Sequence, residues 1–145
     1  MTGAELLWTC RRQRALVRSH EEKIAQLEAE KTSIRSPGFD EAVQTSHKAD
    51  ISDILIQIEN NIIAEQKAYR KLNQLEKAAA EAIAEFVTDP LVQAVLRNRY
   101  LLYKSVPETA VTVEYSEDYV KELQGIGLAE LGVIEFDDET LSRIF

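Results

Sequence analysis

The densest group of side chains that could do chemistry is a run of arginines near the start of the chain. They are Arg11, Arg12, Arg14 and Arg18. Clustered guanidinium groups can bind phosphate oxygens through paired hydrogen bonds. The alternative is a solvated helix face whose arginines pair with acidic side chains of a second helix, which is the commoner arrangement. The sequence alone leaves both interpretations open.

Tyrosines form a second group, in the last third of the chain. Their rings could stack on bases, although aromatic core packing is the commoner role of such residues. The four are Tyr100, Tyr103, Tyr115 and Tyr119.

No residues have the spacing of a catalytic or metal site. His20 and His47 lie on different expected elements, without a cysteine beside either. The single cysteine, Cys10, excludes an internal disulfide and is expected to be a buried apolar side chain. Gly125, Gly127 and Gly132 follow no expected strand, so they do not form a phosphate loop. We therefore expect a non-enzymatic protein with no metal and no cofactor.

Few turn-forming residues occur among the 145 residues, with five Gly and three Pro, so long helices must position these side chains. Thr2 and Glu5 have the spacing of a capping box at a helix start. The first helix then carries one apolar stripe along one face, interrupted by Gln13, His20 and Lys31. The helix is expected to end at Ser36-Pro37-Gly38. The stripe consists of Leu6, Cys10, Val17, Ile24, Leu27 and Ile34.

A second helix is expected from about residue 43 to residue 87, while residues 39–48 could instead form a loop. Its apolar spacing predicts a coiled-coil seam against the first helix and, beyond that partner, against a second copy of the chain. The seam consists of Ile51, Leu55, Ile58, Ile62, Glu65, Tyr69, Leu72, Glu76, Ala79, Ile83 and Phe86. No apolar run is long enough to span a membrane.

The C-terminal third is expected to fold into short helices. Asp89-Pro90 starts a helix through Tyr103, while Ser105 and Ser116 cap two more. Gly125 and Gly127 weaken the third of these helices, which Gly132 stops. Asp137 could cap a last helix anchored by Leu141, Ile144 and Phe145.

Residues 105–131 have the pattern of a helix-turn-helix. The small Ala110 lies on the first helix, the turn falls at Tyr115-Ser116, and Val120 and Leu123 point inward from the second helix. Two helices that cross steeply over a tight turn leave room only for a small side chain at the crossing.

The order of these parts resembles a family of phage and prophage proteins related to the RinA- and ArpU-type late transcription regulators. Asp89-Pro90, Arg99-Tyr100 and the stretch 108–131 carry the resemblance, which covers residues 5–132 in organisation. It implies a helix-turn-helix like region four of sigma factors, in the cytoplasm of a bacterial host. Glu114 stands where the family has a turn glycine.

The fold class expected is all-α, with a helical hairpin over residues 1–88 and a helix-turn-helix bundle over residues 89–145. The resemblance implies a transcription regulator that contacts double-stranded DNA. The residues expected in the groove are Ser116, Glu117, Tyr119, Lys121 and Gln124, and those expected on phosphates are Arg97, Arg99 and Lys104.

Charge favours a second hypothesis. Residues 105–145 carry two Lys/Arg and ten Asp/Glu, a net charge of −8, whereas residues 1–104 carry fifteen of each and are neutral. Non-specific DNA binding needs several cations on phosphates. The alternative is an acidic interaction module that dimerises through the hairpin and docks a basic partner, such as RNA polymerase or a phage protein, without binding DNA.

Overall fold

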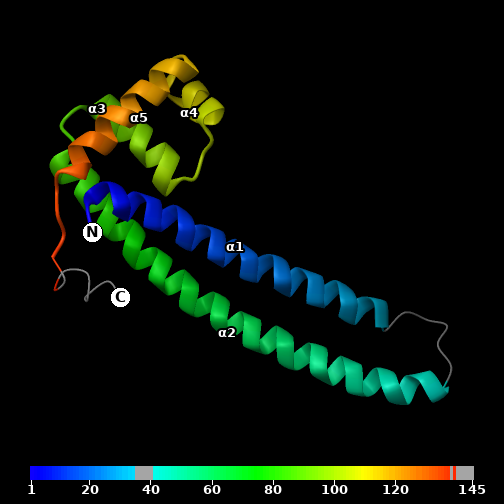
Figure 1. Cartoon of the computed structure of the whole chain (residues 1–145). Helices are drawn as coiled ribbons and strands as arrows, with labels where there is room; N and C mark the ends of the chain where they lie inside the picture. Colours follow the sequence, from blue (N-terminus) through cyan, green and yellow to red (C-terminus); the bar gives the residue numbers. More distant parts are fainter. Residues whose placement is uncertain (35–40, 138, 140–145) are drawn as a thin grey trace. The chain divides into compact units, whose positions relative to one another are not determined.

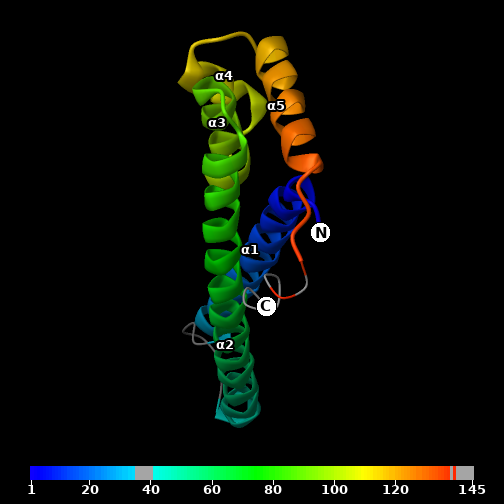
Figure 2. The same cartoon turned by 90° about the vertical axis from the view of Figure 1, so that its left-hand side faces the viewer.

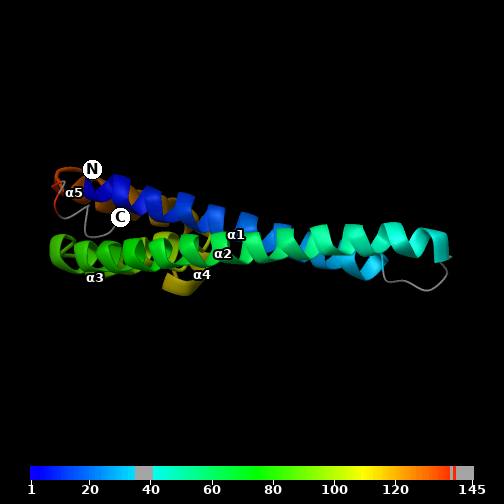
Figure 3. The ribbon, with the colours of Figure 1, turned by 90° about the horizontal axis from the view of Figure 1, so that it is seen from below.

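The computed structural model describes residues 1–34, 41–137 and 139, and in this part of the chain the fold is all-α, as expected (Figure 1). Helices α1 (Gly3–Ile34) and α2 (Glu41–Phe86) run in opposite directions and pack together as a hairpin (Figure 3). After α2 come the helices α3 (Pro90–Leu96), α4 (Val106–Val113) and α5 (Glu117–Gly132). A π-helical segment, η1 (Arg97–Leu101), follows α3 directly.

The chain forms two compact units. One contains residues 15–70, the adjoining parts of α1 and α2. Its apolar core includes Leu27 of α1 with Ile54 and Ile58 of α2. The other unit contains residues 1–14 and 71–145, so the first turns of α1 and the last turns of α2 belong with the short helices.

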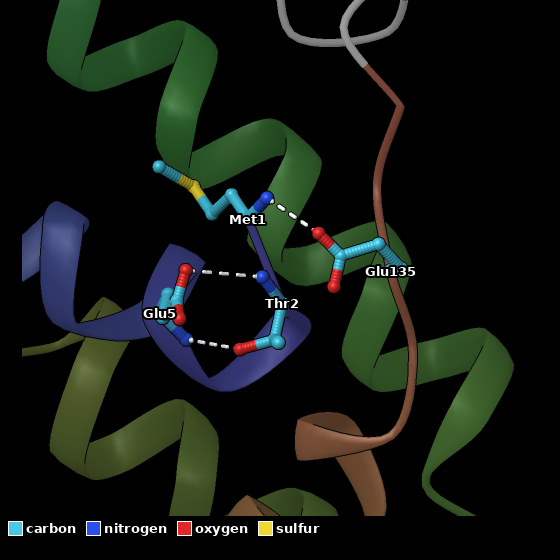
Figure 4. A network of polar contacts seen from close by, with 4 residues as sticks. All are labelled: Met1, Thr2, Glu5 and Glu135. Atoms are coloured by element: carbon cyan, nitrogen blue, oxygen red, sulfur yellow. Dashed lines mark hydrogen bonds and ion pairs between the residues drawn. The ribbon is translucent and has the colours of Figure 1, made fainter.

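The expected helix caps are confirmed. Thr2 and Glu5 satisfy each other's backbone N–H groups, with N···O distances of 3.2 Å to Glu5 Oε2 and 3.1 Å to Thr2 Oγ1 (Figure 4). Asp89, Ser105 and Ser116 accept hydrogen bonds from the first turns of α3, α4 and α5. Each cap satisfies a backbone donor that has no partner inside its helix.

The stripe expected on α1 is confirmed at four of its five positions with described side chains. Leu6, Cys10, Val17 and Leu27 are buried, whereas Ile24 is half-buried. Ile34, the last residue of the stripe, lies outside the residues with described side chains.

The seam expected on α2 is half wrong. Four residues of the expected seam are buried, namely Ile58, Leu72, Ala79 and Ile83. Three others, Leu55, Ile62 and Tyr69, are exposed. The buried face instead passes through residues one position earlier in each heptad, namely Ile54, Ala68, Leu75 and Ala82. Helix α2 therefore carries two apolar stripes. The sequence pattern predicted that the stripe with the larger side chains is buried, whereas the structure buries the stripe with the smaller ones.

Two further expectations are corrected. Residues 41–48 are helical and belong to α2 rather than to a loop. The helix expected to reach Tyr103 leaves α-helical geometry after Leu96, and Tyr103 has a left-handed φ of 58°. Helix α5 ends at Gly132, as expected, and runs without a break through Gly125 and Gly127. Of the last helix expected after Asp137, only residue 139 is described.

The short helices enclose the larger core. Helix α3 packs against α5, which also packs against α4 (Figure 2). Gly127 permits the close approach of α5 to α3, since a Cβ atom there would lie 2.6 Å from Leu96 Cδ1 and 2.8 Å from Val92 Cγ1. Gly127 thus lowers the intrinsic helix propensity of α5, but the packing of α5 against α3 requires it.

Candidate nucleic-acid interface

Helices α4 and α5 form the helix-turn-helix predicted from the sequence. Ala110 is 7% exposed at the crossing, and Val120 and Leu123 are buried behind it. The turn between the helices contains Glu114, with φ 63° and ψ 41°, and Tyr115 donates its backbone N–H to the Ala110 carbonyl at 3.1 Å. The crossing has the small and apolar residues that such a motif requires.

Glu114 has a left-handed backbone conformation at the turn position where the resembled family has glycine. A side chain in this conformation costs about 1–2 kcal/mol. Glycine removes this strain but also gives the unfolded chain more conformational freedom, which offsets part of the gain. Replacing Glu114 by glycine is therefore expected to raise the free energy of unfolding by about 1 kcal/mol. Urea unfolding measures this change. The control, Glu114→Gln, removes the charge but keeps Cβ, and an equal gain in both variants would contradict the backbone explanation.

The residues expected in the groove lie at the start of α5. Ser116 caps the helix, with Oγ accepting from the Tyr119 N–H at 3.2 Å, so its side chain is engaged in the cap. Glu117 and Lys121 are exposed. Tyr119 is partly exposed and its ring lies 5.0 Å from that of Tyr115, between centroids.

Two of the three residues expected on phosphates, Arg99 and Lys104, are hydrogen-bonded to α5 and α4. Arg99 donates from Nε to Gln124 Oε1 at 2.7 Å and from Nη1 to the Lys104 carbonyl at 2.6 Å. Lys104 Nζ donates to Thr112 Oγ1 on α4 at 3.2 Å. These hydrogen bonds hold two cationic side chains against the helix-turn-helix. Arg97 is exposed on η1, and no hydrogen bond joins its side chain to this group among the described residues.

A second cluster, which sequence reasoning missed, joins the N-terminal arginines to η1. The Arg11 guanidinium lies 5.8 Å from the centroid of the Tyr100 ring, and that of Arg14 lies 5.4 Å from the centroid of Tyr103. Trp8 packs edge-on against Tyr100, with a centroid distance of 5.6 Å and an interplanar angle of 78°. We call Trp8, Arg11, Arg14, Tyr100 and Tyr103 the arginine–aromatic cluster.

These arginines do not pair with acidic side chains of α2 in the way first considered. Among the described residues, no carboxylate lies within ion-pair distance of Arg11, Arg12, Arg14 or Arg18. The neighbouring carboxylate, Glu76 of α2, accepts a hydrogen bond from the Tyr103 hydroxyl at 2.6 Å instead. Both the arginine and the tyrosine groups were visible in the sequence, but nothing local indicated that they meet.

Burial and neighbouring charges shift several pKa values in this region. Burial lowers the pKa of Arg99, and the nearby positive charge of Arg11 lowers it further. Burial and the hydrogen bond to Glu76 raise the pKa of Tyr103. Burial, assisted by the Glu76 carboxylate, also raises the pKa of Cys10 to about 12, so this thiol stays protonated and unreactive at neutral pH.

Other kinds of site are absent from the described part of the chain. It holds no group of three or more His, Cys, Asp or Glu side chains placed to bind a metal ion. No helix in the described ranges has the length and apolar character needed to cross a membrane. Comparison of the chain with protein-family models, curated proteins and solved structures returned no match.

Proposed function

We propose that this protein is a transcription regulator of the phage and prophage type that binds double-stranded DNA through the α4–α5 helix-turn-helix. The observation that carries the proposal is the hydrogen-bonded group of Arg99, Lys104 and Gln124 beside α5. Lys121 lies one helical turn before Gln124 on the same helix. The regulatory role, the phage context, the host cytoplasm and contact with RNA polymerase rest on the family resemblance.

The test is a fluorescence-anisotropy titration of the full chain with short DNA duplexes, including phage promoter sequences, at low salt. Binding is expected to weaken as salt rises, because phosphate contacts release counterions. Replacing Lys121 by glutamine is expected to lower the salt slope by about one. The matched control is Lys23→Gln, an exposed lysine in the unit formed by residues 15–70. Absence of binding to every duplex at low salt would overturn the proposal.

A second candidate function is favoured by the acidic surface of α5. Glu117, Asp118 and Glu122 are exposed and form no ion pair with a described residue. The first two also stabilise the helix N-terminus, which accounts for their presence but leaves their outer surface negative. We propose that this surface docks a basic protein surface if DNA is not the ligand. Charge reversal of the three acids should then abolish the binding of purified RNA polymerase to the immobilised chain in a pull-down. Unchanged binding would contradict the docking.

We also propose that a second copy of the chain covers the exposed stripe of α2, antiparallel to the first. The stripe consists of Leu55, Ile56, Ile62, Ile63 and Tyr69, which are 37–65% exposed. The charged residues along this stretch are Asp53, Glu59, Glu65, Lys67, Arg70 and Lys71. An antiparallel pair centred on Ile62 places Asp53 across from Lys71 of the other copy, although Glu59 then lies across from Glu65, whereas an in-register parallel pair places every charge across from a like charge.

The oligomeric state tests this arrangement. Light scattering on the full chain is expected to give a dimer, and Ile63→Glu is expected to give a monomer because it buries a charge in the apolar contact. The control is Val111→Glu, at a residue of α4 that is 80% exposed and lies outside the stripe. A monomeric parent chain, or a dimer that survives Ile63→Glu, would contradict the proposal.

A further inference from the structure

We infer that Arg11 and Arg14 of α1 bind the phosphodiester backbone of a DNA duplex, so that the nucleic-acid interface continues from the helix-turn-helix onto the hairpin helix. This inference rests on the proposed function, since it names a further part of the same interface. Both arginines belong to the compact unit that contains η1, α4 and α5.

The first support is that cationic side chains lie close together without an ion-pair partner. Arg11 lies close enough to Arg99 to disfavour its charged form, and no described carboxylate lies within ion-pair distance of Arg11, Arg14 or Arg99. Like charges held together cost free energy, which an anion placed between them recovers. Phosphate oxygens match guanidinium groups in both charge and hydrogen-bonding geometry.

The second support is that the guanidinium groups are held in place before any ligand arrives. Arg11 and Arg14 each lie over a tyrosine ring, and Arg99 is fixed by two hydrogen bonds. The rings are presented by a π-helical segment and, at Tyr103, by a left-handed backbone. Such departures from regular helix cost free energy and concentrate at functional sites.

The third support concerns the acidic C-terminal segment. Residues 105–145 contain only two cationic side chains, one of them Lys121. Two cations are too few for appreciable phosphate binding. The compact unit also contains Arg11, Arg12 and Arg14 from α1, with Arg97, Arg99 and Lys104 from the stretch before α4. Arg11 and Arg14 of the arginine–aromatic cluster therefore add two cations to those carried by the helix-turn-helix and the stretch before it.

The experiment measures the affinity of the full chain for a labelled duplex over a series of salt concentrations. Arg11→Gln and Arg14→Gln are each expected to weaken binding about three- to tenfold at low salt and to lower the salt slope by about one. The control is Arg18→Gln, an exposed arginine of α1 that lies in the unit formed by residues 15–70 and should leave both quantities unchanged. Arg11→Lys should keep most of the salt slope, which a merely structural role of the side chain would not predict.

Each outcome decides the inference. If the parent chain binds duplex and the Arg11 and Arg14 variants behave like Arg18→Gln, the inference is overturned while the proposed function stands. If no duplex binds at low salt, the proposed function and the inference are both overturned.

Discussion

Replacing Tyr100 by alanine is expected to lower the free energy of unfolding by about 3–5 kcal/mol, the largest stability effect of any substitution considered. Tyr100 is fully buried in the larger core. Its ring also supports the edge of Trp8 and the guanidinium of Arg11. Removing it leaves a cavity that the surrounding helices cannot close without moving. Urea unfolding followed by circular dichroism measures the loss, and a change below about 1 kcal/mol would show that the ring is not part of the core.

The control for this substitution is Tyr100→Phe, which keeps the ring and removes only the hydroxyl. That hydroxyl is buried and has no hydrogen-bond partner among the described residues. An unsatisfied buried polar group costs about 1–3 kcal/mol, so the phenylalanine variant should be as stable as the parent chain or about 1 kcal/mol more stable. A clear loss of stability would reveal a partner for the hydroxyl.

Replacing Gly127 by valine is expected to lower the free energy of unfolding by about 2–3 kcal/mol. The new Cβ would lie within 2.9 Å of three side-chain atoms of Leu96 and Val92, both of which are buried and have no free space to move into. Helices α3 and α5 would therefore have to separate. The same urea titration measures the effect.

The matched control is Gly125→Ala, two residues earlier on α5. No atom lies within 4 Å of the Cβ position there, and alanine has the higher helix propensity. This variant should be more stable by up to about 1 kcal/mol. Equal effects at the two glycines would contradict the close approach of α5 to α3.

The sequence predicted the helix starts correctly because capping is local. A side chain and the backbone N–H that it accepts lie two or three residues apart at Thr2, Asp89, Ser105 and Ser116, so spacing alone identifies them. The α1 stripe was equally readable, since that helix has one dominant apolar face. Helix α2 has two, and only packing decides between Ile54 and Leu55 for the buried position.

The candidate site was predictable in part. The helix-turn-helix follows from the positions of Ala110, Val120 and Leu123, and these residues are buried as expected. The contact between Arg99 and Gln124 joins residues 25 positions apart, and that between Arg11 and Tyr100 joins α1 to η1. Such contacts depend on tertiary packing, for which sequence periodicity carries no signal.

The π-helical segment makes the positions of the residues after it sensitive to the insertion or deletion of a single residue. Removing one residue from Arg97–Leu101 would let the helix close into regular α geometry and would rotate whatever follows by about 100°. Tyr103 would then leave Arg14, and Lys104 would leave Thr112. The composition of the segment would be nearly unchanged, yet its phase would be lost, so its length is the property that holds Tyr103 and Lys104 against their partners.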